Sequence, residues 1–223
     1  MIPWDRLGTA TAPDGATLVL YRRDGEFVIR ADGQELMSSR AHGSEEAMAH
    51  LACAELASRS GVRVLVGGLG MGYTLRAALD ALAADAKVVV AELVPAVVDW
   101  NRGPLGDLAG RPLDDARTDL VIGEVGALLR AGGARYDAIL YDVDNGPQAL
   151  TRKGNQILYT TQGLMLVKGA LRPGGRFAVW SASPDDRFAA RFRRAGFSSV
   201  TSHTVPARGV GGGPRHVIFL GQL

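Results

Sequence analysis

The chain has 223 residues, of which 47% are hydrophobic, and its formal net charge is +2. This length suffices for one domain with a sizeable core, and no apolar run is long enough to span a membrane. The first residues lack a secretory signal, and Cys53 is the only cysteine, which excludes a disulfide within the chain. We therefore expect a soluble, cytoplasmic protein. The arginines are scattered and typical of solvated helix faces, so neither a nucleic-acid partner nor a membrane is expected.

The amino-terminal part of the chain is rich in β-forming residues. An Asp24-Gly25 turn and the apolar patterning around it predict short strands at residues 17–22, 26–30 and 35–37. These strands have no core of their own. We expect a small N-terminal β element, residues 1–42, that packs on a main domain formed by residues 43–223.

From residue 44 onward, helical and β periodicity alternate. Ser44 is expected to be the N-cap of an Ala-rich helix that ends near residue 60. Strands are then predicted at residues 62–67, 87–92, 118–122, 136–142 and 175–181. Helices are predicted at residues 73–84, 94–102, 124–131, 156–171 and 185–195, and residues 103–117 read as a loop. The last two β stretches, residues 198–205 and 215–220, predict an antiparallel edge pair. The order indicates an α/β fold with a Rossmann-like, open and mostly parallel sheet.

The first strand of this domain runs into a glycine-rich turn, which a helical apolar pattern follows. Glycine can take positive φ there, and without a Cβ it lets a ligand approach the backbone and the helix amino terminus. Glu92 ends the next strand 20 residues after Gly72, about the distance at which a ribose-binding acid is expected. Loop, helix and acid together predict a nucleotide-cofactor site in which Glu92 takes both ribose hydroxyls. A tight turn with a chance acid is the alternative.

The same loop excludes two common cofactor sites. Tyr73 stands where a dinucleotide fingerprint needs glycine or alanine, and no Gly-Lys-Ser/Thr follows, as an NTP-binding P-loop requires. The spacing Gly68-x-Gly70-x-Gly72 fits an adenosyl-sulfonium site instead. The four histidines show no metal-ligand spacing and Cys53 has no partner, so no metal site is predicted.

Polar residues follow two further strands at the edge where an open α/β sheet binds ligands. Asp142, Asp144 and Asn145 come directly after the predicted central strand. Carboxylates are costly to put over a pocket unless they hold or deprotonate something, although turn formation alone also favours these residues. Glu124 follows the third strand, where it meets a base edge or, alternatively, serves as an acid in the first turn of a helix.

In order and spacing, these motifs resemble the spermidine synthases, polyamine aminopropyltransferases of the class I S-adenosylmethionine-dependent transferase superfamily. The segments that carry the resemblance are residues 44–51, 64–72, 92, 123–124, 136–142, 146–147 and 170–175. The resemblance implies that the glycine loop and Glu92 hold the tail and ribose of an adenosyl cofactor and that Glu124 meets the adenine. It also implies that Asp142 orients or deprotonates an attacking amine, and that the protein is a homodimer.

The candidate residues follow from this reading. The cofactor-binding candidates are Gly67, Gly68, Leu69, Gly70, Met71, Gly72, Glu92, Leu93, Glu124, Val125 and Asp142. The catalytic candidates are Asp142, Asp144 and Asn145, with the last two steering the acceptor.

Three departures from the family pattern bear on the reaction. Gly70 stands where the family's loop usually carries an aspartate that engages the aminopropyl amine of decarboxylated S-adenosylmethionine. Ser44 replaces a tyrosine that helps bind the diamine, and Asn145 stands at the spacing of a second aspartate. Losing the loop aspartate removes repulsion against the carboxylate of S-adenosylmethionine, worth about 1 kcal/mol at an effective dielectric near 20.

We therefore expect a sulfonium-dependent transferase that acts on a small amine, with a slight preference for methyl transfer. The expected donor, S-adenosylmethionine, should then bind at least as tightly as its decarboxylated form. Two alternatives remain open. One is aminopropyl transfer from decarboxylated S-adenosylmethionine in polyamine synthesis, and the other is a protein that binds the adenosyl cofactor without catalysis.

Overall fold

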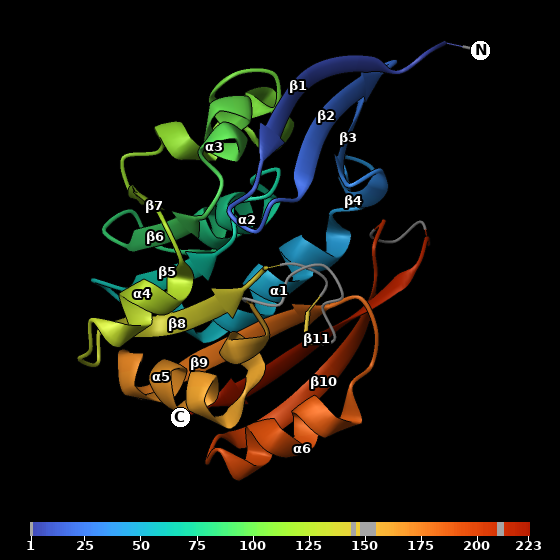
Figure 1. Cartoon of the computed structure of the whole chain (residues 1–223). Coiled ribbons are helices and arrows are strands. Elements are labelled where there is room, and N and C mark those ends of the chain that lie inside the picture. The colour runs from blue at the N-terminus through green and yellow to red at the C-terminus, as the bar shows by residue number, and fades with distance from the viewer. Residues whose placement is uncertain (1, 144–145, 148–154, 209–211) are drawn as a thin grey trace.

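The computed structural model describes residues 2–143, 146–147, 155–208 and 212–223. Figure 1 shows a small sheet above a larger one, and helices cover both faces of the larger sheet. The small sheet contains four antiparallel strands in chain order, namely β1 (Asp5–Thr11), β2 (Thr17–Arg23), β3 (Glu26–Ala31) and β4 (Gln34–Ser38). Three of them were predicted. The sequence did not indicate β1, because its side chains are mostly exposed and give no apolar alternation.

The larger sheet has seven strands in the order β10-β11-β9-β8-β5-β6-β7. The parallel strands are β5 (Arg63–Gly67), β6 (Lys87–Glu92), β7 (Thr118–Ile122), β8 (Tyr136–Tyr141) and β9 (Leu171–Ser181). The antiparallel edge pair consists of β10 (Ser198–Pro206) and β11 (Arg215–Gln222). This arrangement confirms the predicted Rossmann-like sheet, and the strand order reverses between β5 and β8, where such sheets bind ligands.

Strand β9 begins four residues earlier than the sequence predicts. Leu171 pairs with Tyr136, and an irregularity in the register precedes the pairing of Arg176 with Ala138. The Pro-Gly-Gly sequence at residues 173–175 is typical of a turn, and here the irregularity lets the strand continue through it.

The helices are α1 (Gly43–Cys53), α2 (Tyr73–Ala81), α3 (Pro95–Arg102), α4 (Val125–Arg130), α5 (Thr161–Ala170) and α6 (Asp186–Arg194). Four helices agree with the predicted ones within a few residues at their ends, whereas α1 ends seven residues before the predicted residue 60 and α5 begins five residues after the predicted residue 156, because 3-10 helices occupy part of both predicted ranges. Short 3-10 helices are η1 (Ala54–Leu56), η2 (Gly106–Ala109), η3 (Pro112–Asp114) and η4 (Asn155–Tyr159). The predicted loop at 103–117 therefore contains η2 and η3. No described helix is long and apolar enough to cross a membrane.

One predicted helix cap is wrong. Helix α1 begins at Gly43, and His42 occupies the N-cap position without a side-chain capping bond. Ser44 lies inside the first turn and is fully buried. Its hydroxyl contacts Trp180 of β9 and His216 of β11, so packing of α1 on the sheet determines the role of this residue.

Alternating residues of the parallel strands supply two apolar cores, one on each face of the large sheet. Val64 and Val66 pack with α1, α2 and α3, whereas Leu65 packs with α4, α5 and α6. The small sheet joins the first core through Leu20 and Ile29. The N-terminal β element thus packs on the main domain as expected, while the boundary after residue 42 stays a prediction because both parts share this core.

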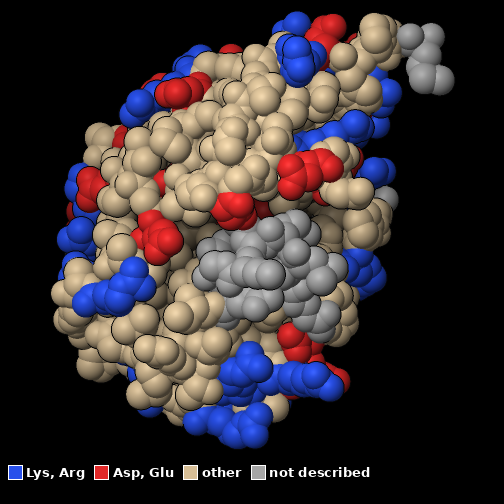
Figure 2. Space-filling view, viewed as in Figure 1, with Lys and Arg blue, Asp and Glu red and all other residues tan. Residues whose placement is uncertain are grey.

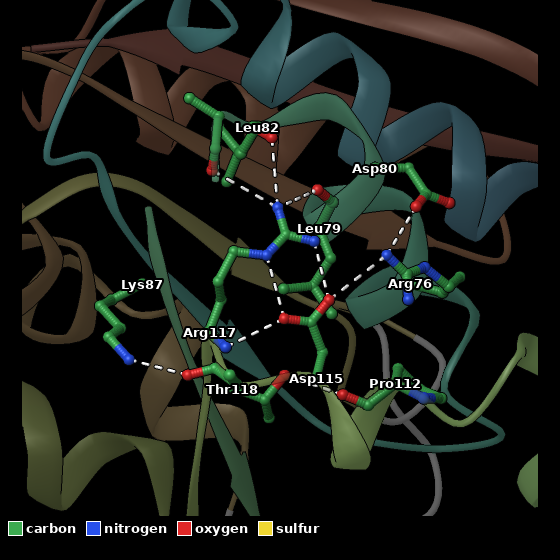
Figure 3. A network of polar contacts seen from close by, with 11 residues as sticks. Arg76, Leu79, Asp80, Leu82, Lys87, Pro112, Asp115, Arg117 and Thr118 are labelled. Atoms are coloured by element: carbon green, nitrogen blue, oxygen red, sulfur yellow. Dashed lines mark hydrogen bonds and ion pairs between the residues drawn. The ribbon is translucent and has the colours of Figure 1, made fainter. Parts of the chain in front are cut away.

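A polar network fixes α2 against the start of β7 (Figure 3). The Arg117 guanidinium donates to the Leu79 and Leu82 carbonyls at the carboxyl end of α2, at 2.8 and 3.2 Å, and forms two bonds to Asp115. A cation at that end is favoured by the helix dipole and by the free carbonyls. The network lies away from the sheet's ligand-binding edge, so we assign it to stability.

Candidate functional site

The glycine loop between β5 and α2 approaches the strand beside it closely. Gly68 has φ of 93°, and a Cβ at this position would overlap the Asp142 carbonyl oxygen. Gly70 is also left-handed, with φ of 53°. Its carbonyl accepts a 2.8 Å hydrogen bond from the buried Asn101 side chain of α3. Only glycine fits at residue 68, and Asn101 holds the loop in position.

A first cavity opens over the carboxyl ends of β5, β6 and β7. It encloses about 880 Å³ including its mouth, and Leu36 and Met37 of β4 form part of its wall. Seven predicted cofactor residues line it, namely Gly68, Gly70, Glu92, Leu93, Glu124, Val125 and Asp142. Apolar side chains of Val94, Val97, Ile157 and Leu158 complete the wall. Such a concave, largely apolar cavity with few polar groups is suited to a nucleoside.

Glu92 is buried at the end of β6, and its carboxylate is fixed by two backbone amides. Leu69 N–H donates to Oε2 at 3.0 Å and Val94 N–H donates to Oε1 at 2.8 Å. Each carboxylate oxygen can accept more than one hydrogen bond. The side chain is therefore preorganised between the glycine loop and the cavity, as the ribose assignment requires.

Glu124 occupies the N-cap position of α4 without a side-chain capping bond. Its side chain is exposed at the cavity wall and lies 3.6 Å from the Arg130 guanidinium. The contact between Glu124 and an adenine stays a prediction. Cofactor binding by the adjacent Val125 also stays a prediction.

The remaining predicted residues divide into three groups. Leu69 and Met71 line a second cavity rather than the first. Gly67 and Gly72 line neither cavity: Gly67 packs on Val125, and Gly72 is the left-handed N-cap of α2. Asp144 and Asn145 lie outside the described residues.

The second cavity adjoins the first at Gly70 and Asp142, which line both. It encloses about 1070 Å³ including its mouth. Three carboxylates line it, from Glu35 of β4, Glu45 of α1 and Asp142. No lysine or arginine occurs among the described residues of its lining. Figure 2 shows acidic side chains on this face, below the N-terminal sheet, whereas basic side chains gather toward α6.

Asp142 connects the two cavities. Its backbone N–H donates to the Gly67 carbonyl at 2.8 Å, and Thr74 Oγ1 donates to its Oδ2 at 2.5 Å. Burial raises the pKa of the Asp142 carboxyl, and the Thr74 bond opposes that rise. A carboxylate with a raised pKa at the boundary of two cavities is suited to proton transfer.

Glu45 is the second partly buried acid of this cavity. Burial raises its pKa, and the nearby charge of Asp142 raises it further. Ser44 Oγ donates to Glu45 Oε2 at 2.5 Å and accepts from Trp180 Nε1 at 2.9 Å. His216 Nδ1 lies 2.8 Å from the same hydroxyl, and burial lowers the pKa of His216.

Sequence reasoning missed Glu45, Thr74, Asn101, Trp180 and His216. Glu45 and Thr74 lie within segments that the motifs already covered, so their side chains could have been proposed as candidates. The others come from α3, β9 and β11, and only the packing of these elements brings them to the glycine loop and α1. No group of three potential metal ligands occurs in the described part of the chain.

Comparison with known proteins relates most of this region to one family. The family model for the spermine/spermidine synthase domain matches residues 41–185. Polyamine aminopropyltransferase 2 of Pseudomonas aeruginosa is 36% identical over 156 residues, which are 65% of this chain and 42% of that protein. The polyamine aminopropyltransferase of Mycobacterium tuberculosis is 32% identical over 157 residues, 66% of this chain and 29% of that protein. The chain thus spans less than half the length of these relatives.

Solved structures show the same fold. Spermidine synthase from Thermotoga maritima superposes with a TM-score of 0.75 at 19% identity, covering 97% of this chain and 72% of that one. A spermidine synthase in complex with the transition-state analogue AdoDATO gives a TM-score of 0.74 at 19% identity, with the same coverage.

Proposed function

We propose that this chain, which belongs to the spermine/spermidine synthase family, transfers an aminopropyl group from decarboxylated S-adenosylmethionine to a small amine. The first cavity would hold the adenosyl part of the donor, with Glu92 on the ribose. The second cavity would hold the donor's aminopropyl tail and the acceptor amine. Because the chain spans only part of its curated relatives, their activity comes to it as a proposal.

In this reaction the acceptor nitrogen attacks the aminopropyl carbon bound to sulfur. A carbon–nitrogen bond forms, the carbon–sulfur bond breaks, and its electron pair returns to sulfur to give neutral methylthioadenosine. The attacking amine loses a proton, for which Asp142 is the proposed acceptor. Holding nitrogen, carbon and sulfur in line between the two cavities would supply several kcal/mol of the barrier reduction.

The acidity of the second cavity is the observation that favours decarboxylated S-adenosylmethionine over S-adenosylmethionine as the donor. The tail of decarboxylated S-adenosylmethionine ends in an ammonium, whereas S-adenosylmethionine adds a carboxylate. The cavity has three acidic side chains and no lysine or arginine among its described lining residues, so it favours the ammonium over the carboxylate. Burial raises the pKa of Glu45 to about 8, and a bound ammonium would favour its charged form. Each like-charge pair costs about 1 kcal/mol or more at an effective dielectric near 20.

This argument reverses the slight preference for methyl transfer that the sequence suggested. That preference came from the three departures at Gly70, Ser44 and Asn145, and its argument about the donor considered only the missing loop aspartate at Gly70. Glu35 and Glu45 come from outside the loop, and both line the cavity beside Gly70. The relatives that are polyamine aminopropyltransferases also support the aminopropyl reading.

The proposed acceptor is an amine. That the protein is a homodimer and that it is cytoplasmic both stay predictions. The donor is tested by calorimetry on the unmodified protein with both sulfonium compounds side by side. We expect decarboxylated S-adenosylmethionine to bind at least about tenfold more tightly, which corresponds to the removal of one unfavourable charge contact. Equal or tighter binding of S-adenosylmethionine would overturn the aminopropyl proposal.

A further inference from the structure

The glycine loop has space for an acidic side chain at Gly70 but carries none. A Cβ built on Gly70 meets only Met37 of β4, with Sδ at 3.5 Å, which is ordinary van der Waals contact. The left-handed φ of 53° is one that aspartate and asparagine tolerate better than most residues. The missing charge is therefore a property of this sequence that the surrounding packing does not force.

Glu45 lines the same cavity as Gly70 and comes from the first turn of helix α1. Thr74 and Asp142 line this second cavity too. Its carboxylate is oriented by Ser44, whose hydroxyl is in turn fixed by the indole N–H of Trp180. A side chain held through two successive hydrogen bonds has a defined direction, as a ligand-binding group needs.

The charge of Glu45 lacks a cationic partner in the described structure. The neighbouring Glu46 forms a 2.9 Å bond with His42, and Glu35 is exposed at the cavity rim. Asp142, His216 and Tyr73 line the same cavity as Glu45, and none of them is a permanent cation. Burial and the charge of Asp142 raise the pKa of Glu45 to about 8, and a cation bound between these two acids would stabilise their charged forms.

We infer that Glu45 supplies, from helix α1, the carboxylate that binds the donor's terminal ammonium in place of the acid missing at Gly70. The inference rests on the proposed aminopropyl transfer and assigns the donor specificity to a residue outside the glycine loop. Glu45 and Asp142 then enclose the ammonium, and Trp180 contributes an aromatic wall on which a cation is also favoured.

The test removes the acidic side chain at Glu45 and introduces one at Gly70. Dissociation constants for decarboxylated S-adenosylmethionine and for methylthioadenosine are measured by calorimetry on the parent, Glu45→Gln, Gly70→Asp and the double variant. Glu46→Gln is the matched control on α1, and Gly70→Asn is the uncharged control in the loop. Methylthioadenosine lacks the aminopropyl ammonium, so it reports on the adenosyl cavity alone.

We expect Glu45→Gln to weaken binding of the decarboxylated donor at least about tenfold, because a charge-assisted bond is lost. Methylthioadenosine binding should change by less than about threefold, and Glu46→Gln should change neither constant by more than that. Adding Gly70→Asp, but not Gly70→Asn, should restore donor binding to within about threefold of the parent.

Three results would overturn the inference while leaving aminopropyl transfer intact. Glu45→Gln could bind the decarboxylated donor as tightly as the parent. It could weaken methylthioadenosine equally, which indicates a structural role, or raise only the acceptor KM, which assigns Glu45 to the acceptor. A parent protein without preference for the decarboxylated donor would instead contradict the proposed function itself. Should the double variant fail to fold, the Glu45→Gln comparison with methylthioadenosine still decides the question.

Discussion

Strand β8 has an aspartate near each end, and their surroundings are opposite. Asp137, at the amino end, is 1% exposed and accepts bonds from the Arg59 and Arg172 guanidinium groups at 2.9 and 2.6 Å. The Arg63 backbone N–H adds a further bond of 2.8 Å. Asp142, just beyond the carboxyl end, receives one side-chain bond from Thr74 and faces the charge of Glu45.

We interpret this difference as one between a structural acid, Asp137, and an acid with a proposed catalytic role, Asp142. At Asp137 the chain itself supplies the compensating cations, so the charge contributes to the fold. At Asp142 the described residues supply a hydroxyl and a second carboxylate, so a cation from outside would complete the site. A buried charge is expensive unless it is paired. Asp142 and Glu45 have no cationic partner among the described residues. We therefore expect a positively charged substrate at this edge of the sheet.

The largest expected effect concerns the paired acid. Asp137→Ala should lower the free energy of unfolding by about 3 kcal/mol, because the Arg63 N–H loses its acceptor and two guanidinium groups lose their partner. The value lies low in the range for broken buried pairs because Arg59 and Arg172 are partly exposed. Chemical denaturation measures it, and Asp119→Ala on the exposed side of β7 is the control. A loss below about 1 kcal/mol would remove the structural assignment.

We expect substitution of Asp142 to lower activity and to leave the fold intact. Asp142→Asn should lower kcat by about a hundredfold or more, because the proton acceptor for the amine is lost, while the fold is retained. Methylthioadenosine should bind within about threefold of the parent value, since Asp142 acts on the transferred group and the acceptor. Steady-state kinetics and calorimetry on one preparation test both parts. Full activity, or a selective loss of methylthioadenosine binding, would show that the role is misassigned.

Glu92 is an intermediate case, a buried acid satisfied by backbone amides at the ligand-binding edge. Glu92→Ala should weaken methylthioadenosine binding at least about tenfold, because the ribose hydroxyls would be buried without an acceptor. Glu124→Ala, at the exposed end of the same cavity, is the comparison and should have the smaller effect. Unchanged affinity in Glu92→Ala would remove the ribose assignment.

The smallest expected effect is in the pH dependence of stability. Bonds from Arg117 lower the pKa of Asp115 to about 2, so its contribution is present above the ordinary carboxyl pKa and disappears as the pH falls toward 2. Burial raises the pKa of Asp142, so its charged form costs stability, and that cost grows as the pH rises above about 4.

Unfolding free energies of Asp115→Asn and Asp142→Asn, measured against pH, sharpen the contrast. The first variant should lose stability relative to the parent only above about pH 3, by under about 1 kcal/mol because Asp115 is near the surface. The second should gain stability relative to the parent as the pH rises. Parallel curves for both variants would contradict the distinction between the two kinds of acid.

Much of the sheet could be predicted, because buried parallel strands give long apolar runs that end in glycines or acids. Glu92 and Asp142 were found for the same reason, since they end such runs. Ser44 and Glu45 were not understood, because their roles depend on α1 packing against β9 and β11, which are distant in sequence. The preference for S-adenosylmethionine as donor came from departures from the family pattern, and it did not take into account that Glu45 of α1 lines the same cavity as Gly70.

Product identification tests the central claim most directly. The protein is incubated with a short aliphatic diamine and with either S-adenosylmethionine or its decarboxylated form, and the products are identified by mass spectrometry. The account predicts an aminopropylated amine and methylthioadenosine from the decarboxylated donor alone, in amounts that Asp142→Asn greatly reduces. A methylated amine and S-adenosylhomocysteine from S-adenosylmethionine, with no aminopropylated product, would contradict it.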